Sequence, residues 1–340
     1  MPDIHICKTG KAGRITLNRP AALNALSYEM ALEIEAALDE WAVDPSVDLV
    51  IIDAEGEKAF CAGGDIQELY DTAKAGDFEY GRKFWHDEYR MNAKLFNFPK
   101  PYVAFMQGFT MGGGVGISCH GSHRIVCENS QIAMPECGIG LVPDVGGSLL
   151  LARAPGHLGE YLGCTAARMD AGNAIYAGFA DYYIECAAWP ALIEALEGGD
   201  LEAIEEAALP APVASLKADQ AAIDRSFDGR TVGDIIRGFQ GSDWELKTEK
   251  ALRRNCPLSV ECALELVRRV RGLDSIEGAL GMEYRFTFRS ASEGDFIEGI
   301  RAAIIDKDRN PQWSPATLED VTPLNISKML MPLGADALKL

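Results

Sequence analysis

Two carboxyl side chains, Glu136 and Asp144, stand eight residues apart in the glycine-rich segment 134–147. Each follows a proline and has apolar neighbours, in the sequences MPE and LVPDV. A carboxyl group in apolar surroundings has a raised pKa, which makes it a better acid or base near neutral pH. Paired carboxylates in a loop are also common as solvated helix caps, so the pattern by itself leaves both interpretations open.

A second set of candidate groups belongs to the backbone, in the turns CAGGD at 61–65 and MGGGVG at 111–116. Glycine lets a backbone N–H approach a ligand closely, and two such groups can stabilise one developing oxyanion. Neither turn matches the phosphate-binding pattern GxxxxGK[ST], and the spaced glycines do not complete the dinucleotide-binding pattern. Tight turns between packed elements are the alternative interpretation.

Other catalytic chemistries find less support in the sequence. No Gly-x-Ser-x-Gly segment supplies the nucleophile position of a serine hydrolase. The spacing of Cys119, His120, His123 and Cys127 matches no zinc site, so we expect structural roles for them and no metal.

Strands and helices must hold these groups in place. Residues 4–6 and 14–17 flank a glycine-containing turn, which predicts a hairpin. Ser27 is expected to cap a helix, and the apolar run 49–52 suits a strand buried on both faces. The succession of strand, glycine-rich turn and helix then returns twice before about residue 147.

Glu88 falls in a helical stretch, 84–94, where a solvated face is the simplest interpretation. The aromatic side chains beside it, Phe84, Trp85 and Tyr89, are expected to serve packing. Near residue 190 the chain becomes rich in alanine, leucine and glutamate. We therefore expect a mixed α/β part, 1–190, that carries the site, and a mostly helical part, 191–340.

The charge balance limits the classes of partner. With 32 basic and 51 acidic residues the chain has a formal net charge of −19, which argues against nucleic acid and anionic membranes but allows a locally basic anion site. The nine cysteines are odd in number and form no CxxC pairs, which favours reduced thiols. Neither a signal segment nor an apolar run of about 18 residues is present, so we expect a soluble, cytoplasmic protein.

Four segments, in order along the chain, resemble the crotonase (enoyl-CoA hydratase/isomerase) superfamily. They are LNRPAALNALS (17–27), AFCAGGDI (59–66), KPYVAFMQGFTMGGGVG (100–116) and the PE…PDVGG turn (135–147). The resemblance implies an α/β fold, a spiral of ββα units with a mostly helical C-terminal part, and a small-molecule acyl-CoA partner.

The resemblance also implies roles for particular residues. The backbone amides of Gly64 and Gly113 would form the oxyanion hole, and the backbone around Ala62, Asp65 and Ile66 would hold the adenine end of the substrate. CoA is part of the substrate, so no separate cofactor is expected, and the amides make a metal unnecessary. Family members form trimers or dimers of trimers, so a homo-oligomer is expected.

One position departs from the family. The residue after LNRP, often basic and thought to meet a CoA phosphate, is Ala21. Arg19 or another basic residue would have to replace that contact.

Within the superfamily, hydratases carry one glutamate after the GGG turn and a second in the PE turn. This chain has Gly116 at the first position and Glu136 at the second, and Asp144 stands where hydratases have a small residue. Glu88, HGSHR (120–124), MEYR (282–285) and the segment 295–313 resemble the 3-hydroxyisobutyryl-CoA hydrolases, which extends the likeness to nearly the whole chain.

That likeness implies hydrolysis of a short β-hydroxyacyl-CoA thioester in valine breakdown. Glu136 would activate water as general base or attack directly as nucleophile, and both routes stay open. Asp144 would orient the substrate hydroxyl or the water, and Glu88 would complete the polar end of the acyl pocket. Hydration or isomerisation of an enoyl-CoA is the alternative activity, and an RNA-binding or scaffolding role is the non-enzymatic one.

Overall fold

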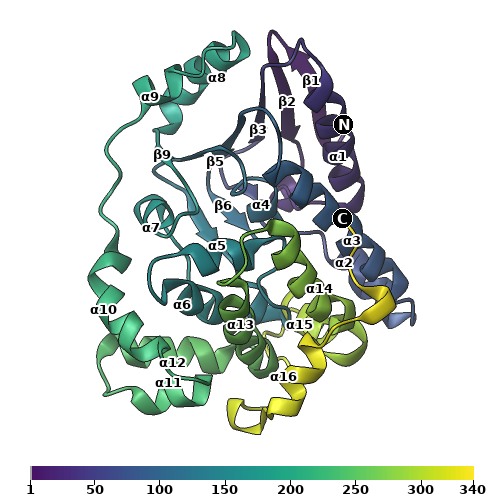
Figure 1. The fold of residues 1–340 in the computed structure, drawn as a ribbon, viewed down its shortest axis with the longest axis vertical. Helices are drawn as coiled ribbons and strands as arrows, with labels where there is room; N and C mark the ends of the chain where they lie inside the picture. The colour runs from purple at the N-terminus through teal and green to yellow at the C-terminus, as the bar shows by residue number, and fades with distance from the viewer. Residues whose placement is uncertain (1) are drawn as a thin grey trace. The chain divides into compact units, whose positions relative to one another are not determined.

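The computed structural model describes residues 2–340 (Figure 1). Its chain forms two compact units that interleave along the sequence. We call the first the sheet unit, because every strand among the described residues lies in it; it comprises Met1–Gly64, Arg90–Ala133 and Arg168–Lys217. The second, the helical unit, comprises Asp65–Tyr89, Met134–Ala167 and Ala218–Leu340. The chain therefore changes unit directly after Gly64 and two residues before Glu136.

The main sheet of the sheet unit has six strands in the order β1-β2-β3-β5-β7-β9. The predicted hairpin is present: β1 and β2 pair antiparallel, with Ile4 opposite Leu17, and each later strand is parallel to its neighbour. The strands are β1 (Ile4–Thr9), β2 (Ala12–Leu17), β3 (Leu49–Ala54), β5 (Tyr102–Met106), β7 (His123–Val126) and β9 (Tyr182–Tyr183). The first five residues of β3 are buried, as expected for a strand covered on both faces.

A second, three-stranded parallel sheet is built from β4 (Ala59–Cys61), β6 (Phe109–Met111) and β8 (Gln131–Ala133). Each of these strands directly follows a strand of the main sheet along the chain, so successive strand pairs place one strand in each sheet. A helix or helical turn comes next each time: α2 (Gln67–Lys74), α4 (Gly113–Gly116) and η2 (Glu136–Ile139). This repeat is the spiral of ββα units that the sequence predicts.

Helices cover the main sheet within the sheet unit. Ser27 caps α1 (Tyr28–Val43) by accepting the Met30 N–H at 3.2 Å, as predicted. A side chain at position 13 would overlap the Trp41 ring, so Gly13 lets α1 lie close to β2. Another apolar cluster joins Trp189 and Leu192 to the strands; it involves α8 (Trp189–Glu197) and α9 (Ala203–Ala207). The remaining short elements of this unit are η1 (Pro20–Ala22), α7 (Ala171–Tyr176) and η3 (Cys186–Ala188).

The helical unit is organised around α13 (Pro257–Val270), which packs against α5 (Gly147–Arg153), α6 (Leu158–Thr165) and α14 (Ile276–Glu293). Its other helices are α11 (Val232–Gly238), α12 (Asp243–Arg254), α15 (Phe296–Ile300), α16 (Pro323–Leu330) and the short turns η4 (Arg301–Ile305), η5 (Leu318–Asp320) and η6 (Gly334–Asp336). Two helices contribute residues to both units: α3 (Glu79–Phe96) and α10 (Ser215–Phe227).

The predicted change to helical structure near residue 190 agrees with the elements, since β9 is the last strand along the described chain. The compact units do not divide there, because 65–89 and 134–167 pack with the later helices. No helix among residues 2–340 is long and apolar enough to cross a membrane.

Candidate active site

Four buried carboxyl side chains gather in the helical unit, and we call them the acidic cluster. They are Glu88 of α3, Glu136 of η2, Asp144 of the following loop and Glu283 of α14, which are 2, 5, 4 and 0% exposed. Glu88 is therefore not on a solvated helix face, and that interpretation of the sequence is wrong. Ionising a carboxyl group with so little access to water is unfavourable, so its pKa rises. Acid–base catalysis uses carboxyl groups whose pKa is raised in this way.

The pKa values in the acidic cluster are raised. Burial raises the pKa of Glu136 well above its ordinary value, and the neighbouring carboxylates Asp144, Glu283 and Glu88 raise it further. Burial also brings the pKa of Asp144 to about 7, and burial and the charge of Asp144 raise the pKa of Glu88. Because Glu136 and Asp144 influence one another, the protonation of one depends on that of the other.

Glu136 opens the helical turn η2, and two local contacts shape its surroundings. Its backbone carbonyl accepts the Leu141 N–H at 3.1 Å, which closes the turn. A Cβ at position 147 would lie 3.1 Å from the Met134 sulfur and collide with its methyl group, so Gly147 leaves space for the Met134 side chain. Among residues 2–340, the buried Oε2 of Glu136 has no hydrogen-bond partner. A buried carboxylate oxygen in that state calls for a ligand or an ordered water.

Asp144 is held by a tyrosine that the sequence did not single out for chemistry. The Tyr89 hydroxyl is buried and donates to Asp144 Oδ2 at 2.7 Å, and it also lies 3.4 Å from Thr287 Oγ1. Tyr89 is buried and packs edge-on against Tyr284, as predicted, and its hydroxyl adds a polar contact that the sequence did not suggest. Since one carboxylate oxygen of Asp144 accepts this bond, the direction of the other oxygen is set by the protein.

Glu283 is the member of the acidic cluster that sequence reasoning missed. It appeared only within the MEYR segment, with no role of its own. A signal was available: the buried residues of α14 include Ala279, Leu280 and Thr287, so a glutamate at 283 falls within the apolar stripe of an amphipathic helix.

The glycines of the two turns lie in the sheet unit, and the turns touch each other. A Cβ at position 114 would overlap the carbonyl oxygen of Cys61 and lie 2.9 Å from its Cβ, so the GGG turn requires glycine there. The CAGGD turn is held by segment 23–26, because the Leu26 N–H donates to the Gly63 carbonyl at 2.9 Å. Gly113 is the first residue of α4, where backbone N–H groups have no partner inside the helix.

The residues expected at the adenine end follow the CAGGD turn. The Ala62 N–H donates to the Leu23 carbonyl at 3.0 Å, so the fold itself uses this amide. Asp65 accepts the Gln67 N–H at 3.4 Å, and Ile66 caps α2. All three are partly exposed. Ala62 belongs to the sheet unit, whereas Asp65 and Ile66 belong to the helical unit.

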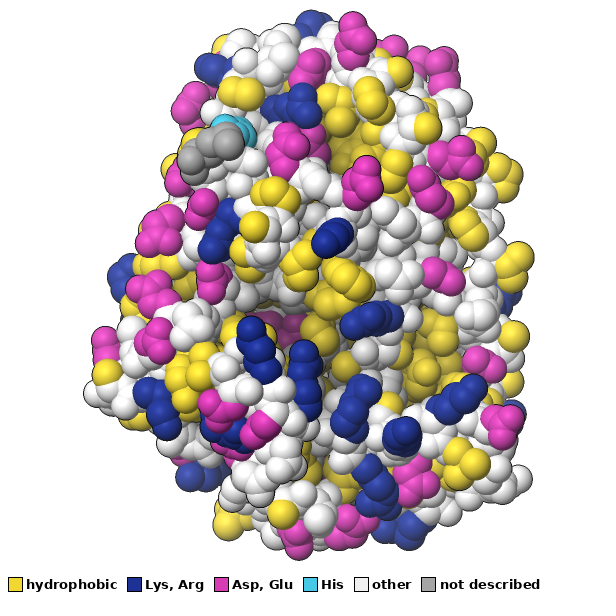
Figure 2. All heavy atoms as spheres, turned by 180° about the vertical axis from the view of Figure 1, so that it is seen from behind, with side chains coloured by type: hydrophobic (Ala, Val, Ile, Leu, Met, Phe, Trp, Pro, Cys, Tyr) yellow, Lys and Arg dark blue, Asp and Glu magenta, His cyan; other side chains and the backbone are white. Residues whose placement is uncertain are grey.

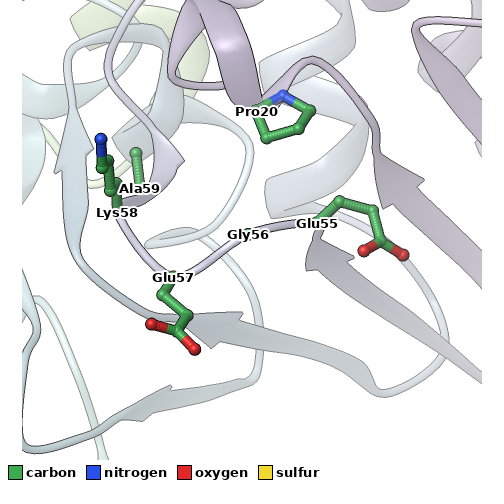
Figure 3. Close-up of a pocket in the computed structure, with 6 residues that line it drawn as sticks. All are labelled: Pro20, Glu55, Gly56, Glu57, Lys58 and Ala59. Carbon is green, nitrogen blue, oxygen red and sulfur yellow. The ribbon is translucent and has the colours of Figure 1, made fainter.

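A surface pocket of about 320 Å³ lies beside the LNRP turn in the sheet unit (Figure 3). Pro20 and the loop Glu55–Ala59 line it, including the exposed Lys58. Arg19 is committed elsewhere in the fold: its Nη1 donates to the Ala25 carbonyl at 2.8 Å, and its Nε lies 3.2 Å from Asp3.

The residues first considered for a metal are separated by their packing. His120 lies edge-on to Phe96, His123 stacks on Tyr182, and Cys119 contacts the Met106 sulfur. A different group, Cys127, Glu128 and Cys186, brings three ligand atoms within 4.8 Å of one another, so among the described residues it is the set that could hold an ion.

Comparisons with known proteins identify a matching family and similar relatives. The family model for enoyl-CoA hydratase/isomerase matches residues 12–330. The mitochondrial 3-hydroxyisobutyryl-CoA hydrolase of Gallus gallus is 38% identical over 353 residues, covering 99% of this chain and 91% of that protein. A probable 3-hydroxyisobutyryl-CoA hydrolase of Arabidopsis thaliana is 37% identical, covering 90% of this chain and 85% of its own length.

Solved structures agree on the fold but carry other activity names. An enoyl-CoA hydratase from Rhodobacter sphaeroides is 54% identical with a TM-score of 0.95, and each chain is covered completely. A carnitinyl-CoA dehydratase from Mycobacterium thermoresistibile is 37% identical with the same TM-score, with coverage of 100% of this chain and 99% of the other. The resemblance inferred from the sequence is confirmed, and the chain belongs to the enoyl-CoA hydratase/isomerase (crotonase) family.

Proposed function

We propose that this chain hydrolyses the thioester of 3-hydroxyisobutyryl-CoA, and of other short 3-hydroxyacyl-CoA molecules, to the free acid and CoA. The proposal rests on Glu136. Its carboxyl group is buried and has a raised pKa, and its Oε2 has no hydrogen-bond partner among the described residues. The names of the curated relatives support the substrate class. A role in valine breakdown would follow from that substrate.

In the proposed reaction, the N–H groups of Gly64 and Gly113 bind the thioester oxygen. As the carbonyl carbon becomes tetrahedral, that oxygen gains negative charge, and these two donors stabilise it. Losing one such donor typically costs about 3 kcal/mol of barrier. This role for the backbone needs no metal and no cofactor beyond the CoA of the substrate.

Glu136 supplies the attack on the thioester carbon. As general base it would take a proton from water while the water oxygen attacks, and the C–S bond would then break to release CoA. As nucleophile its carboxylate would attack the thioester carbon, the C–S bond would break to release CoA, and water would cleave the resulting acyl anhydride in a second step. Both routes yield the same acid and CoA, and both need Glu136 ionised.

Asp144 and Glu88 would set the substrate preference. With Oδ2 of Asp144 held by Tyr89, its other oxygen is the proposed acceptor for the β-hydroxyl of the substrate or for the attacking water. Glu88 would form the polar end of the acyl pocket. The burial of both groups supports this assignment, because a polar group without water discriminates strongly between ligands that pair with it and ligands that do not.

For the CoA phosphates we propose Lys58 in place of Arg19. Arg19 already serves the fold, whereas Lys58 is exposed at the pocket beside Pro20 (Figure 3). Lys and Arg side chains also gather in the lower half of the face shown in Figure 2, despite the net charge of −19. The backbone around Ala62, Asp65 and Ile66 remains the proposed contact for adenine.

Enoyl-CoA hydration is the second candidate, because the solved structure that is 54% identical carries that name. Gly116 opposes it. The position where hydratases have a glutamate carries no side chain, and the Gly116 carbonyl accepts a bond from the Asn92 amide at 3.2 Å. Release of free thiol across a panel of short acyl-CoA esters, compared with loss of the enoyl absorbance of crotonyl-CoA, separates the two activities.

The assembly and the compartment are also proposals. We propose a homo-oligomer, a trimer or a hexamer, and light scattering of the purified protein would measure it. We propose a cytoplasmic location, although several curated relatives are named as mitochondrial proteins. Fractionation of the source cells would decide between these compartments.

A further inference from the structure

Glu283 binds a single turn of the chain through both of its carboxylate oxygens. Its Oε2 accepts the Gly146 N–H at 2.9 Å, and its Oε1 accepts the Ser148 N–H at 3.1 Å. The Ser148 hydroxyl donates to Oε1 as well. The carboxyl group is completely buried, so these three donors take the place that water would otherwise fill.

The turn that Glu283 binds has an unfavourable backbone. Val145 has a φ of 51° and Gly146 a φ of 77°. A positive φ is ordinary for glycine but is a genuine outlier for a β-branched residue. Such a conformation persists only where the surroundings hold it in place, and it is typical of functional sites. Asp144 directly precedes Val145, so its backbone direction depends on this turn.

We propose that Glu283 is a positioning residue for the reaction, because it holds the turn 145–148 and so fixes the Asp144 carboxylate beside Tyr89. Glu283 acts through Asp144 and is not assigned contact with the substrate. This inference rests on the proposed function, which gives Asp144 its role. It adds to that function by naming the residue that keeps Asp144 in position within the acidic cluster.

The test is Glu283→Gln, with Glu261→Gln as its matched control. Glu261 is also a buried glutamate of the helical unit, and its carboxylate accepts the Val232 N–H at 3.1 Å. In both variants one oxygen becomes an NH2 group, which cannot accept from a backbone N–H. The measurements are kcat and KM for 3-hydroxyisobutyryl-CoA across pH, and hydrogen–deuterium exchange of the peptide that contains Gly146 and Ser148.

For Glu283→Gln we expect kcat to fall by about tenfold to a hundredfold, as for a small misplacement of a reacting group. KM should change little, and the amides of the turn should exchange faster. Glu261→Gln should keep kcat within about twofold, since it touches no group assigned to the reaction. Ser148→Ala removes only the hydroxyl donor and should lower kcat by a smaller factor, and it serves if Glu283→Gln does not fold.

The inference is overturned if Glu283→Gln keeps the wild-type kcat and exchange, or if Glu261→Gln loses as much activity. Failure of the proposed function looks different: the wild-type protein would release no thiol from any acyl-CoA. In that case the exchange experiment still reports whether Glu283 holds the turn.

Discussion

The acidic cluster and the glycine turns achieve their chemistry in opposite ways. In the acidic cluster, four side chains are useful because the protein has removed water from around them. In the glycine turns, the backbone is useful because side chains are missing, as the overlap expected for a Cβ at position 114 shows. Removing a carboxyl group from the acidic cluster should therefore lower activity, whereas in the glycine turns adding a side chain should lower it.

Among substitutions in the acidic cluster, Glu136→Gln should lower activity the most. The amide keeps the shape of the side chain but cannot take a proton or attack, so kcat should fall by about 10²–10⁴-fold. Binding of the CoA ester should be roughly unchanged, which kcat and KM from the thiol-release assay will show. Retention of more than about a tenth of the wild-type kcat would mean that Glu136 is not the base.

The corresponding change in the glycine turns is Gly114→Ala. The added methyl group would overlap the Cys61 carbonyl and displace the turn that bears Gly113, so we expect activity to fall by about a hundredfold. Gly238→Ala is the control, because a Cβ there meets no atom within 4 Å. Both variants would be assayed for thiol release after their folding is checked by circular dichroism. Equal activity in the two variants would argue against a role for this turn.

Asp144→Ala distinguishes the role of Asp144 from that of Glu136, because it tests substrate specificity as well as rate. If Asp144 pairs with the β-hydroxyl, the wild-type enzyme should prefer 3-hydroxyisobutyryl-CoA to isobutyryl-CoA. The variant should lose about 1–3 kcal/mol of that preference, seen as a narrower ratio of kcat/KM values. An equal fall for both esters would assign Asp144 to the water or to Glu136 and move the specificity role to Glu88.

The last expected effect concerns how the stability of the fold depends on pH. Burial raises the pKa of Asp144 to about 7 and that of Glu283 to about 8, above their values in the unfolded chain. The folded state therefore holds more protons than the unfolded state in this range, and stability should increase as the pH falls from about 8 toward 5. Activity should change in the opposite direction, because Glu136 must be ionised.

Asp144→Asn isolates this effect, since the amide oxygen can still accept from Tyr89 but cannot titrate. Urea unfolding at several pH values should show a pH dependence that is flatter than in the wild type, by on the order of 1–3 kcal/mol across the range. A slope equal to that of the wild type would mean that Asp144 keeps its ordinary pKa in the folded protein.

Local patterns predicted much of the fold. The Ser27 cap, the first hairpin and the buried strand β3 each depend on neighbours within a few residues, and all three are present. The interleaving of the units was not predicted, because helical periodicity shows that 65–89 and 134–167 contain helices but not which later helices they join.

The site residues likewise differ in whether the sequence could predict them. Glu136 and Asp144 are visible because proline and apolar neighbours mark them in one short segment. Tyr89 and Glu283 gain their importance from partners 55 and 137 residues away, Asp144 and Gly146. Periodicity marks a glutamate on an apolar helix face as unusual, but it does not name the backbone amides that such a glutamate will meet.

The interleaved units also determine how this polypeptide can be shortened. Cutting after residue 190 would retain Glu136 and Asp144 but discard α13 and α14, which cover α5 and supply Glu283. The fragment would expose the apolar surfaces of α5 and α6, and it should aggregate rather than fold as a smaller catalyst.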